Sequence, residues 1–296
     1  MTMDLIASPQ LLFSALVLGA GYALVGLGLN LVYGTMRLLN VGHGDLVMLG
    51  AYVAFWCFAL TGLPPPLAAP LAAALGVLLA EALHRGLLHR LLGAGAERIE
   101  ANSLLVFFGL SIIVQNLAAL AFTASPRALR TLDDVVHVAG VAMTESRIVI
   151  LLVALAVCGG VLIGLRATVW GLAIKAVIDN GRAAAVVGVD VPRVRRLALW
   201  AGFAIAGLAG ALLAMVEQIG PFMGFPYTIA AFVVIILGGL GRLGGGVMAG
   251  LLLGFVQVYG VALTAPTFSS MLLYGTFVAV LLLRPQGLAR AARIRS

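Results

Sequence analysis

The sequence predicts an all-α, polytopic integral membrane protein with about eight or nine transmembrane or re-entrant helices. Hydrophobic residues make up 62% of the 296 residues and charged residues only 10%, with a mean hydropathy of +1.15. A soluble domain has about 25% charged residues, and it needs a polar exterior that this composition does not supply. The apolar residues also gather in runs that are long enough, at about 20 residues per crossing, to span a bilayer.

The predicted elements follow these apolar runs in chain order. They lie at about 11–35, 46–62, 66–84, 102–123, 147–165, 197–216, 228–241, 247–265 and 270–283. The runs at 228–241 and 270–283 are short, and that at 46–62 begins directly after a polar stretch, so these three are candidates for re-entrant or half-length elements. The loop at 124–146 carries several acidic residues, and 166–196 is the longest polar segment between runs.

Positive charge is distributed unevenly between the loops on the two sides of the predicted bundle. Of the 18 Lys and Arg residues, one side holds only Arg127, Arg130 and Arg147. The other 15 are Arg37, Arg85, Arg90, Arg98, Arg166, Lys175, Arg182, Arg193, Arg195, Arg196, Arg242, Arg284, Arg290, Arg293 and Arg295. Because cytoplasmic loops carry the excess of Lys and Arg, we expect a cytoplasmic C-terminus and, with nine crossings, a periplasmic N-terminus. This topological excess explains the pI of about 10.1 and argues against nucleic-acid binding.

Small residues recur every fourth position along two of the runs. The first series is Gly202, Ala206 and Gly210, and the second is Gly246, Gly250 and Gly254. Small residues at this spacing let helix backbones approach closely in lipid, so the pattern predicts helix packing within the chain, with a subunit interface as the alternative. The run LGGLGRLGGG at 237–246 lacks the Gly-Lys-Ser/Thr of a phosphate-binding loop, and we expect a turn there instead.

A few polar side chains stand inside or beside the apolar runs. Ser111, Gln115 and Asn116 lie on one predicted helix, where they either bond neighbouring helices or line a translocation path. Glu217 and Gln218 follow the run 197–216, and a solvated helix end is the simpler interpretation. The scarcity of ionisable groups within the runs argues against ion-coupled transport. Cys57 and Cys158 lie in apolar segments, so neither is expected to form a disulfide or bind a metal.

The most polar stretch of the N-terminal half is LNLVYGTMRLLNVGHGDLVMLGAY, which contains Tyr33, Asn40, His43 and Asp45. Its glycines weaken helix continuity, and an exposed backbone at membrane depth is tolerated only where protein or water surrounds it. Interrupted helices often occur near the substrate sites of transporters. A lone His-x-Asp pair is weak evidence for catalysis or metal binding, so we predict no catalytic residue and no metal site. These residues either line a path or brace a broken helix.

The polar segment 166–196 predicts two short helices, the second around residues 183–187, followed by a break at Gly188. Such a pair makes a compact surface that another protein could grip. Three blocks then carry a family resemblance: the stretch quoted above, GLAIKAVIDNGRAAAVVGVDVPRVRRLA, and GPFMGFPYTIAAFVVIILGGLGRLGGGVMAGLLLG. In order and spacing they resemble the LivH-type permeases of branched-chain amino-acid ABC transporters over nearly the full length. Lys175 stands where the family typically has Arg, and the third block lacks the family's proline after Gly241.

The resemblance implies an ABC-importer permease fold formed by residues 1–296 as one transmembrane domain, with an ATPase-coupling loop at about 166–196. It implies a LivM-like second permease, two cytoplasmic ATPases that carry ATP and Mg, and a periplasmic substrate-binding protein, with no cofactor or enzymatic activity on this chain, in a bacterial inner membrane. The residues expected at the ATPase contact are Gly171, Lys175, Asn180, Arg182, Ala184, Gly188 and Arg193.

The implied cargo is a branched-chain or other hydrophobic amino acid. Related importers carry urea, short amides or other small solutes, so this alternative stays open at the level of sequence. An ion-coupled secondary transporter and a membrane enzyme that uses His43 and Asp45 are the alternatives from other classes.

Overall fold

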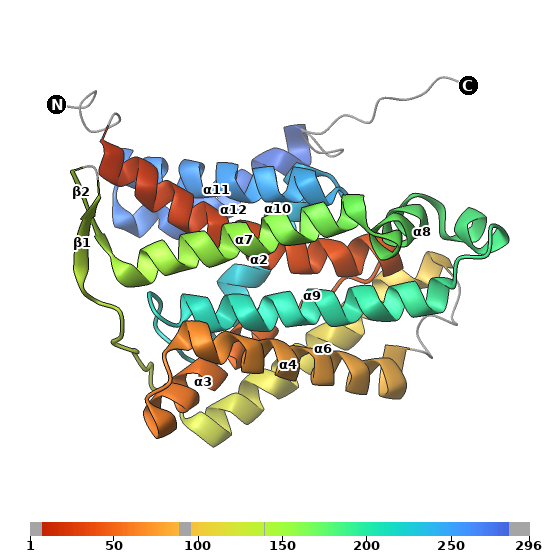
Figure 1. The fold of residues 1–296 in the computed structure, drawn as a ribbon, viewed down its shortest axis with the longest axis horizontal. Helices are drawn as coiled ribbons and strands as arrows, with labels where there is room; N and C mark the ends of the chain where they lie inside the picture. Colours follow the sequence, from red (N-terminus) through yellow and green to blue (C-terminus); the bar gives the residue numbers. More distant parts are fainter. Residues whose placement is uncertain (1–7, 89–95, 139, 284–296) are drawn as a thin grey trace.

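The computed structural model describes residues 8–88, 96–138 and 140–283, and the all-α expectation is confirmed (Figure 1). The helices, in order, are α2 (Pro9–Met36), α3 (His43–Thr61), α4 (Pro65–Leu83), the π-helical η1 (His84–Leu88), α6 (Ala96–Phe122), α7 (Glu145–Ala167), α8 (Val169–Val186), α9 (Val191–Leu213), α10 (Gly224–Gly238), α11 (Leu243–Leu263), the 3₁₀ turn η2 (Pro266–Phe268) and α12 (Ser269–Leu283). Within the described residues, eight helical segments are long and apolar enough to cross a membrane, and α10 is a shorter apolar helix.

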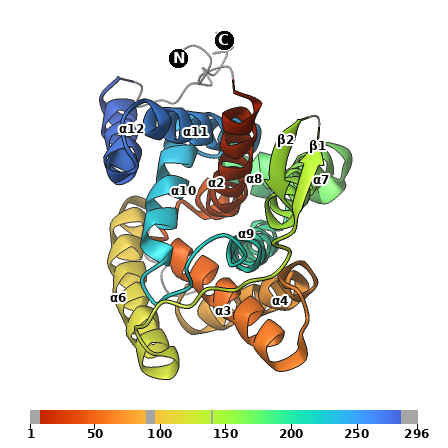
Figure 2. The same ribbon diagram turned by 90° about the vertical axis from the view of Figure 1, so that its left-hand side faces the viewer.

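Helix α2 forms the centre of the bundle. From Gly19 to Met36 every residue is buried, because the helix is apolar all round and therefore packs on all sides. Figure 2, which looks along the helices, shows α2 surrounded by α7, α9, α10 and α11, with α6 and α12 at the periphery. The core is accordingly built around α2, and the other helices are arranged by their contacts with it.

Glycines set the closest helix contacts, and both small-residue series pack inside the chain. A Cβ at Gly250 or Gly254 would collide with the backbone of α2 at Ala23 and Gly19, so α2 and α11 run antiparallel in direct backbone contact. On α9, Gly202 faces the backbone of Gly28. The close approach maximises dispersion contacts, which replace the missing hydrophobic drive in lipid.

The loop at 124–146 contains a β-hairpin that the sequence reasoning did not predict. Strands β1 (Val135–Val138) and β2 (Val141–Thr144) pair antiparallel, with Val135 opposite Thr144. Gly140 adopts a positive φ of 83°, the backbone conformation that two-residue hairpin turns require. The β-branched residues on either side favour strands. This local signal lies in the segment 124–146, which the sequence analysis describes only as a loop.

The hairpin marks one end of the bundle, and α8 marks the opposite end (Figure 1). The side chain of Gln10, at the start of α2, donates to the Ala142 carbonyl (2.7 Å). Arg127 and Ile219 form an isolated antiparallel bridge, which joins the segment before the hairpin to the segment after α9. The start of α2, the hairpin loop and the end of α9 therefore share one side.

Candidate functional site

The chain between α2 and α3 turns back into the bundle. Helix α2 ends at Met36, its C-cap residue Arg37 adopts a left-handed φ of 57°, and the next helix, α3, begins only at His43. The His43 Nε2 atom lies 3.1 Å from the carbonyl oxygen of Val25. Val25 lies eleven residues before the end of α2 at Met36, or about 16 Å along the axis at 1.5 Å per residue. Helix α3 therefore begins deep in the bundle, as the predicted interruption required.

A second helix start meets the first at this depth. Gly44 lies so close to the Gly224 carbonyl, at the start of α10, that a Cβ on either glycine would collide with the other backbone. The Thr228 hydroxyl accepts from the Gly44 N–H (2.9 Å) and donates to the Val41 carbonyl (3.1 Å). Thr228 thus supplies hydrogen bonds that the first turn of α3 cannot make within the helix. Sequence reasoning missed Thr228, whose signal was a single hydroxyl in an otherwise apolar run.

A cavity of about 90 Å³ opens beside this junction, between α3, α4, α6 and α9. Asn40, Asp45 and Ser111 supply its polar groups. Its apolar wall is formed by Leu46, Leu49, Leu79, Leu83, Phe107, Leu110, Val114 and Phe203. Asp45 Oδ1 accepts from the Gln115 amide (2.9 Å), which also bonds the Ser111 hydroxyl (3.0 Å). Three residues predicted from two distant segments therefore line one cavity, and Gln115 is joined to two of them by hydrogen bonds.

Several of these polar atoms have no hydrogen-bond partner among the residues that the structure describes. Asn40 is 1% exposed and Asp45 4% exposed. Within the described residues, neither side-chain polar atom of Asn40 makes a hydrogen bond, and neither does the Oδ2 atom of Asp45. Most buried polar groups in proteins are hydrogen-bonded, and exceptions call for a specific explanation. The cavity thus presents one amide and one carboxylate oxygen that are free to bind a polar solute against an aliphatic and aromatic wall.

The other residues predicted for the path lie elsewhere. His43 is buried behind the junction, bonded to α2, and is a brace in this structure. Tyr33 donates to Glu100 (3.1 Å) near the end of α2. Asn116 is exposed and donates back to the Ile112 carbonyl of its own helix (2.8 Å), so it does not share the cavity with Ser111. Of the predicted set, Asn40, Asp45, Ser111 and Gln115 remain together.

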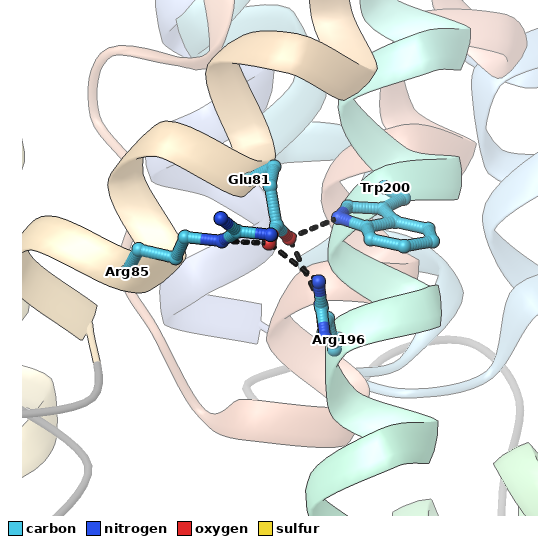
Figure 3. Close-up of polar contacts among 4 residues, drawn as sticks. All are labelled: Glu81, Arg85, Arg196 and Trp200. Carbon is cyan, nitrogen blue, oxygen red and sulfur yellow. Dashed lines mark hydrogen bonds and ion pairs between the residues drawn. The ribbon is translucent and has the colours of Figure 1, made fainter.

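A second polar cluster joins α4 to α9 and was not predicted (Figure 3). The Glu81 carboxylate accepts from the Arg196 guanidinium (Nε to Oε2, 2.8 Å) and from the Trp200 indole (3.0 Å). Arg196 also bonds the other carboxylate oxygen, as does Arg85 from the next turn of the helix that carries Glu81. Both oxygens of Glu81 are therefore satisfied within the chain, in the two-pronged geometry that suits Arg and carboxylate.

Three arginines at the start of α9 contact three different elements. The Arg193 guanidinium lies over the Trp170 ring of α8, 5.3 Å from its centroid. The Arg195 side chain donates to the Thr35 carbonyl at the end of α2 (3.2 Å). Arg196 binds Glu81 of α4. The first turns of α9 therefore connect α8 to the central helix and to α4.

Helix α8 is two helical pieces joined at Asn180, as the sequence suggested. Asn180 leaves helical geometry (φ −157°, ψ 96°), and its Oδ1 atom accepts from the N–H groups of Arg182 and Ala183 (both 3.1 Å), which caps the second piece. Arg182, Gly188 and Arg193 are exposed and Lys175 is half-buried. Gly171 and Ala184 are buried, Gly171 against the backbone of Leu165 and Ala184 beside Val177. These two residues therefore pack within the chain and position α8, and their place at a partner contact stays a prediction.

The tight turn after α10 explains the glycine-rich run at 237–246. Gly239 and Gly241 adopt positive φ angles of 90° and 78°. The Asn30 side chain of α2 accepts from the Gly241 N–H (2.8 Å) and donates to the Arg242 carbonyl (3.1 Å). This run is the expected turn, between α10 and α11, and Asn30, which holds it, is a further structural residue that sequence reasoning missed.

Interrupted helices that meet at membrane depth around a partly unsatisfied polar cavity are typical of multi-pass membrane transport proteins. The family model described as the permease component of branched-chain amino acid transport systems matches residues 11–281. The chain therefore belongs to this permease family.

Relatives in both bacteria and an archaeon match along nearly the whole chain. The branched-chain amino acid permease protein BraD of Pseudomonas aeruginosa is 29% identical, with 94% of each chain covered. LivH of Escherichia coli K12, named as a high-affinity branched-chain amino acid permease protein, is 28% identical with the same coverage. A probable LivH of Methanocaldococcus jannaschii is 26% identical over 94% of this chain and 91% of the relative.

Proposed function

We propose that this chain is one of two permease subunits in an ATP-binding-cassette importer, and that residues 1–296 form a single transmembrane permease domain. Its partners are a LivM-like second permease, two cytoplasmic ATPases and a periplasmic substrate-binding protein. ATP and Mg²⁺ bind to the ATPases, and this chain carries no cofactor or catalytic residue. The family membership, and the relatives' names as branched-chain amino acid permease proteins, support this assignment.

The proposed cargo is a branched-chain or other hydrophobic amino acid. The relatives named above are branched-chain amino acid permeases. The cavity of about 90 Å³ at Asn40 and Asp45, called the mid-depth cavity below, supports the same class of solute. Its aliphatic wall faces the Asn40 amide and the Asp45 carboxylate oxygen that have no partner among the described residues. A carboxylate and an amide can bind an ammonium group, while the leucines and Phe107 contact the side chain.

The single observation that carries the coupling proposal is the exposed apolar surface of α8, which lies outside the candidate membrane spans. Val169, Trp170 and Leu172 are exposed on its first piece, and Val186 and Val187 at its end. Apolar side chains gathered on a polar loop mark a protein interface. We infer that the ATPases bind here, and that their nucleotide-driven closure moves α8, α9 and, through Arg195 and Arg196, helices α2 and α4.

The proposed orientation places α8 in the cytoplasm and the hairpin end in the periplasm of a bacterial inner membrane, with the N-terminus outside and the C-terminus inside. The described arginines at the α8 end, among them Arg166, Arg182 and Arg193, support this orientation. Six of the 15 Lys and Arg residues expected on the cytoplasmic side lie outside the described residues or have side chains that are not described. They are Arg90, Arg98, Arg284, Arg290, Arg293 and Arg295. The C-terminus lies outside the described residues as well.

Gly188→Trp tests the coupling surface. Gly188 forms the exposed turn between α8 and α9 with a positive φ of 89°, so a large side chain both strains the turn and adds bulk to the proposed interface. In proteoliposomes with the assembled importer, we expect ATP hydrolysis to continue while leucine uptake falls about tenfold or more. Gly188→Asn is the matched control, because Asn tolerates positive φ and is small. Normal uptake by a correctly assembled Gly188→Trp importer would contradict the proposal.

A further inference from the structure

A carboxylate at the hairpin end of the bundle lies between two cavities. Glu217 lies four residues after the end of α9 at Leu213, and it lines a cavity of about 380 Å³ and another of about 230 Å³. The larger cavity lies against α2, α10, α11 and α12, and the smaller one against α2, α7, α9 and α11. A water occupies about 30 Å³ in the liquid, so both cavities have room for an organic solute.

The smaller cavity combines two opposite charges with an aliphatic wall. Arg147 lines it from α7 and Glu217 from the end of α9. The ion pairs recorded among the described residues do not join Arg147 to Glu217. The wall between them is formed by Val17, Leu18, Ile150, Leu213, Val216 and Val258, and Ser14 adds a hydroxyl. A positive group, a negative group and an aliphatic surface in one cavity match the three parts of a zwitterionic aliphatic amino acid.

The larger cavity holds its polar side chains in a fixed chain of hydrogen bonds. The Tyr22 hydroxyl donates to Gln257 Oε1 (2.6 Å), and Gln257 Nε2 donates to the Ser269 hydroxyl (2.8 Å). The Tyr22 and Tyr227 rings meet edge to face, 6.3 Å between centroids. These contacts join α2, α10, α11 and α12, so the polar side chains that line the larger cavity with Glu217 are held in place.

The electrostatics of Glu217 favour a cationic partner. Glu217 is exposed as a residue, and partial burial of its carboxyl group raises the pKa of Glu217, while the nearby Tyr227 hydroxyl lowers it in part. A carboxylate that has lost part of its hydration gains most from a charged donor. An ammonium group is such a donor.

We propose that the smaller cavity is a docking site for an aliphatic amino acid at the hairpin end of the permease. Glu217 accepts hydrogen bonds from the α-ammonium group, Arg147 donates to the α-carboxylate, and the Val17–Leu18–Ile150–Val258 wall contacts the side chain. This inference rests on the proposed function and adds a second site, distinct from the mid-depth cavity at Asn40 and Asp45. The solute would occupy this site after it leaves the binding protein and before it reaches the mid-depth cavity.

Direct binding of tritiated L-leucine to the purified importer, without its binding protein, tests the site. We expect saturable binding that is weakened about tenfold or more in Glu217→Gln and in Arg147→Gln, because each variant loses a hydrogen bond to a charged group. Leucine should compete better than 3-methylbutylamine, which lacks the carboxylate, and better than 4-methylpentanoate, which lacks the ammonium. The advantage over 4-methylpentanoate should shrink in Glu217→Gln, and that over 3-methylbutylamine in Arg147→Gln.

The matched controls are Asp133→Asn and Arg130→Gln, two exposed charges at the same end that line neither cavity, and both should bind like the wild type. Val258→Trp, which fills the aliphatic wall and keeps both charges, should also abolish binding and covers the case of a charge variant that does not assemble. Wild-type affinity in Glu217→Gln, Arg147→Gln or Val258→Trp would overturn the inference, as would an importer that transports leucine but does not bind it here. A wild-type importer that transports no leucine, isoleucine or valine would instead overturn the proposed function.

Discussion

Two polar regions of this permease lie beside α4 and α9, the half-buried Glu81 cluster and the buried cavity at Asn40 and Asp45, and they differ in how their charges are satisfied. At Glu81 on α4, each carboxylate oxygen accepts from two donors, which Arg85 supplies from η1 and Arg196 and Trp200 supply from α9. At the mid-depth cavity, the part of the chain that the structure describes offers no hydrogen-bond partner to one oxygen of Asp45 or to either amide atom of Asn40. Both regions are polar groups in apolar surroundings, so polarity alone does not distinguish them.

The difference separates a brace, meaning a cluster that only holds helices together, from a working site, meaning a cavity that binds the solute. A fully satisfied network holds helices in a single arrangement, and it loses stability when one of its less exposed members is removed. An unsatisfied buried group lowers stability, and it is kept where function requires it. We therefore assign the Glu81 cluster to the connection between α4 and the α8–α9 unit, and the Asn40–Asp45 cavity to solute binding. The predictions below test this division.

The largest effect is expected at the junction that forms the cavity. Gly44→Val places a branched side chain where the Gly224 carbonyl and the Thr228 hydroxyl lie, and neither backbone can move without separating α3 from α10. We expect no detectable assembled permease in membranes. Gly109→Val on α6, where a Cβ meets nothing within 4 Å, is the control and should assemble. Normal amounts of Gly44→Val would show that α3 and α10 are not in the contact described.

A smaller but specific effect is expected at the working site. Asp45→Asn keeps the shape of the side chain and its contact with Gln115, and removes a carboxylate whose second oxygen is unpartnered. Uptake per assembled importer should fall about tenfold or more, as expected for a lost hydrogen bond to a charged solute, while the Tm stays the same or rises. Uptake of labelled leucine and a thermal melt of the same preparation check both halves. Unchanged uptake would remove Asp45 from the solute site.

The smallest effect on transport is expected at the brace. Glu81→Gln weakens the bonds to Arg196 and Trp200, so the amount of folded permease should fall several-fold, while uptake per assembled importer stays within about twofold of the wild type. Arg85→Gln is the matched control, because the Arg85 side chain is 74% exposed and an exposed ion pair contributes little to stability. A strong loss of uptake in Glu81→Gln with normal abundance would give Glu81 a role in transport.

The sequence predicted the helices and the interruption before His43 because both depend on local signals. Apolar runs of spanning length define the helices, and Gly42, Gly44 and the polar residues around them mark the break. The packing of the two small-residue series on α9 and α11 could also be predicted, since their spacing follows the helical period. The structure places Asn40, Asp45, Ser111 and Gln115 together, which no single segment could show.

Contacts between distant segments were not predictable from one sequence. Glu81 and Arg196 lie 115 residues apart, and nothing local to either residue identifies its partner. Thr228 and Asn30 stand alone in apolar runs, so their roles depend on which helix start or turn packs against them. The buried positions of Gly171 and Ala184 within the α7–α8–α9 corner likewise depend on packing, although both residues lie in a segment whose exposed surface was expected.

The most direct test of the division between brace and working site is the Tm of the Asn40→Leu permease, measured beside that of Glu81→Gln and the wild type. The substitution removes two unpartnered polar atoms from a buried site with an aliphatic wall. We therefore predict a Tm equal to or above that of the wild type, and a strongly reduced uptake of the solute leucine. Glu81→Gln should show the opposite pattern. A lower Tm in Asn40→Leu, with uptake per assembled importer intact, would contradict the account and make Asn40 a structural residue.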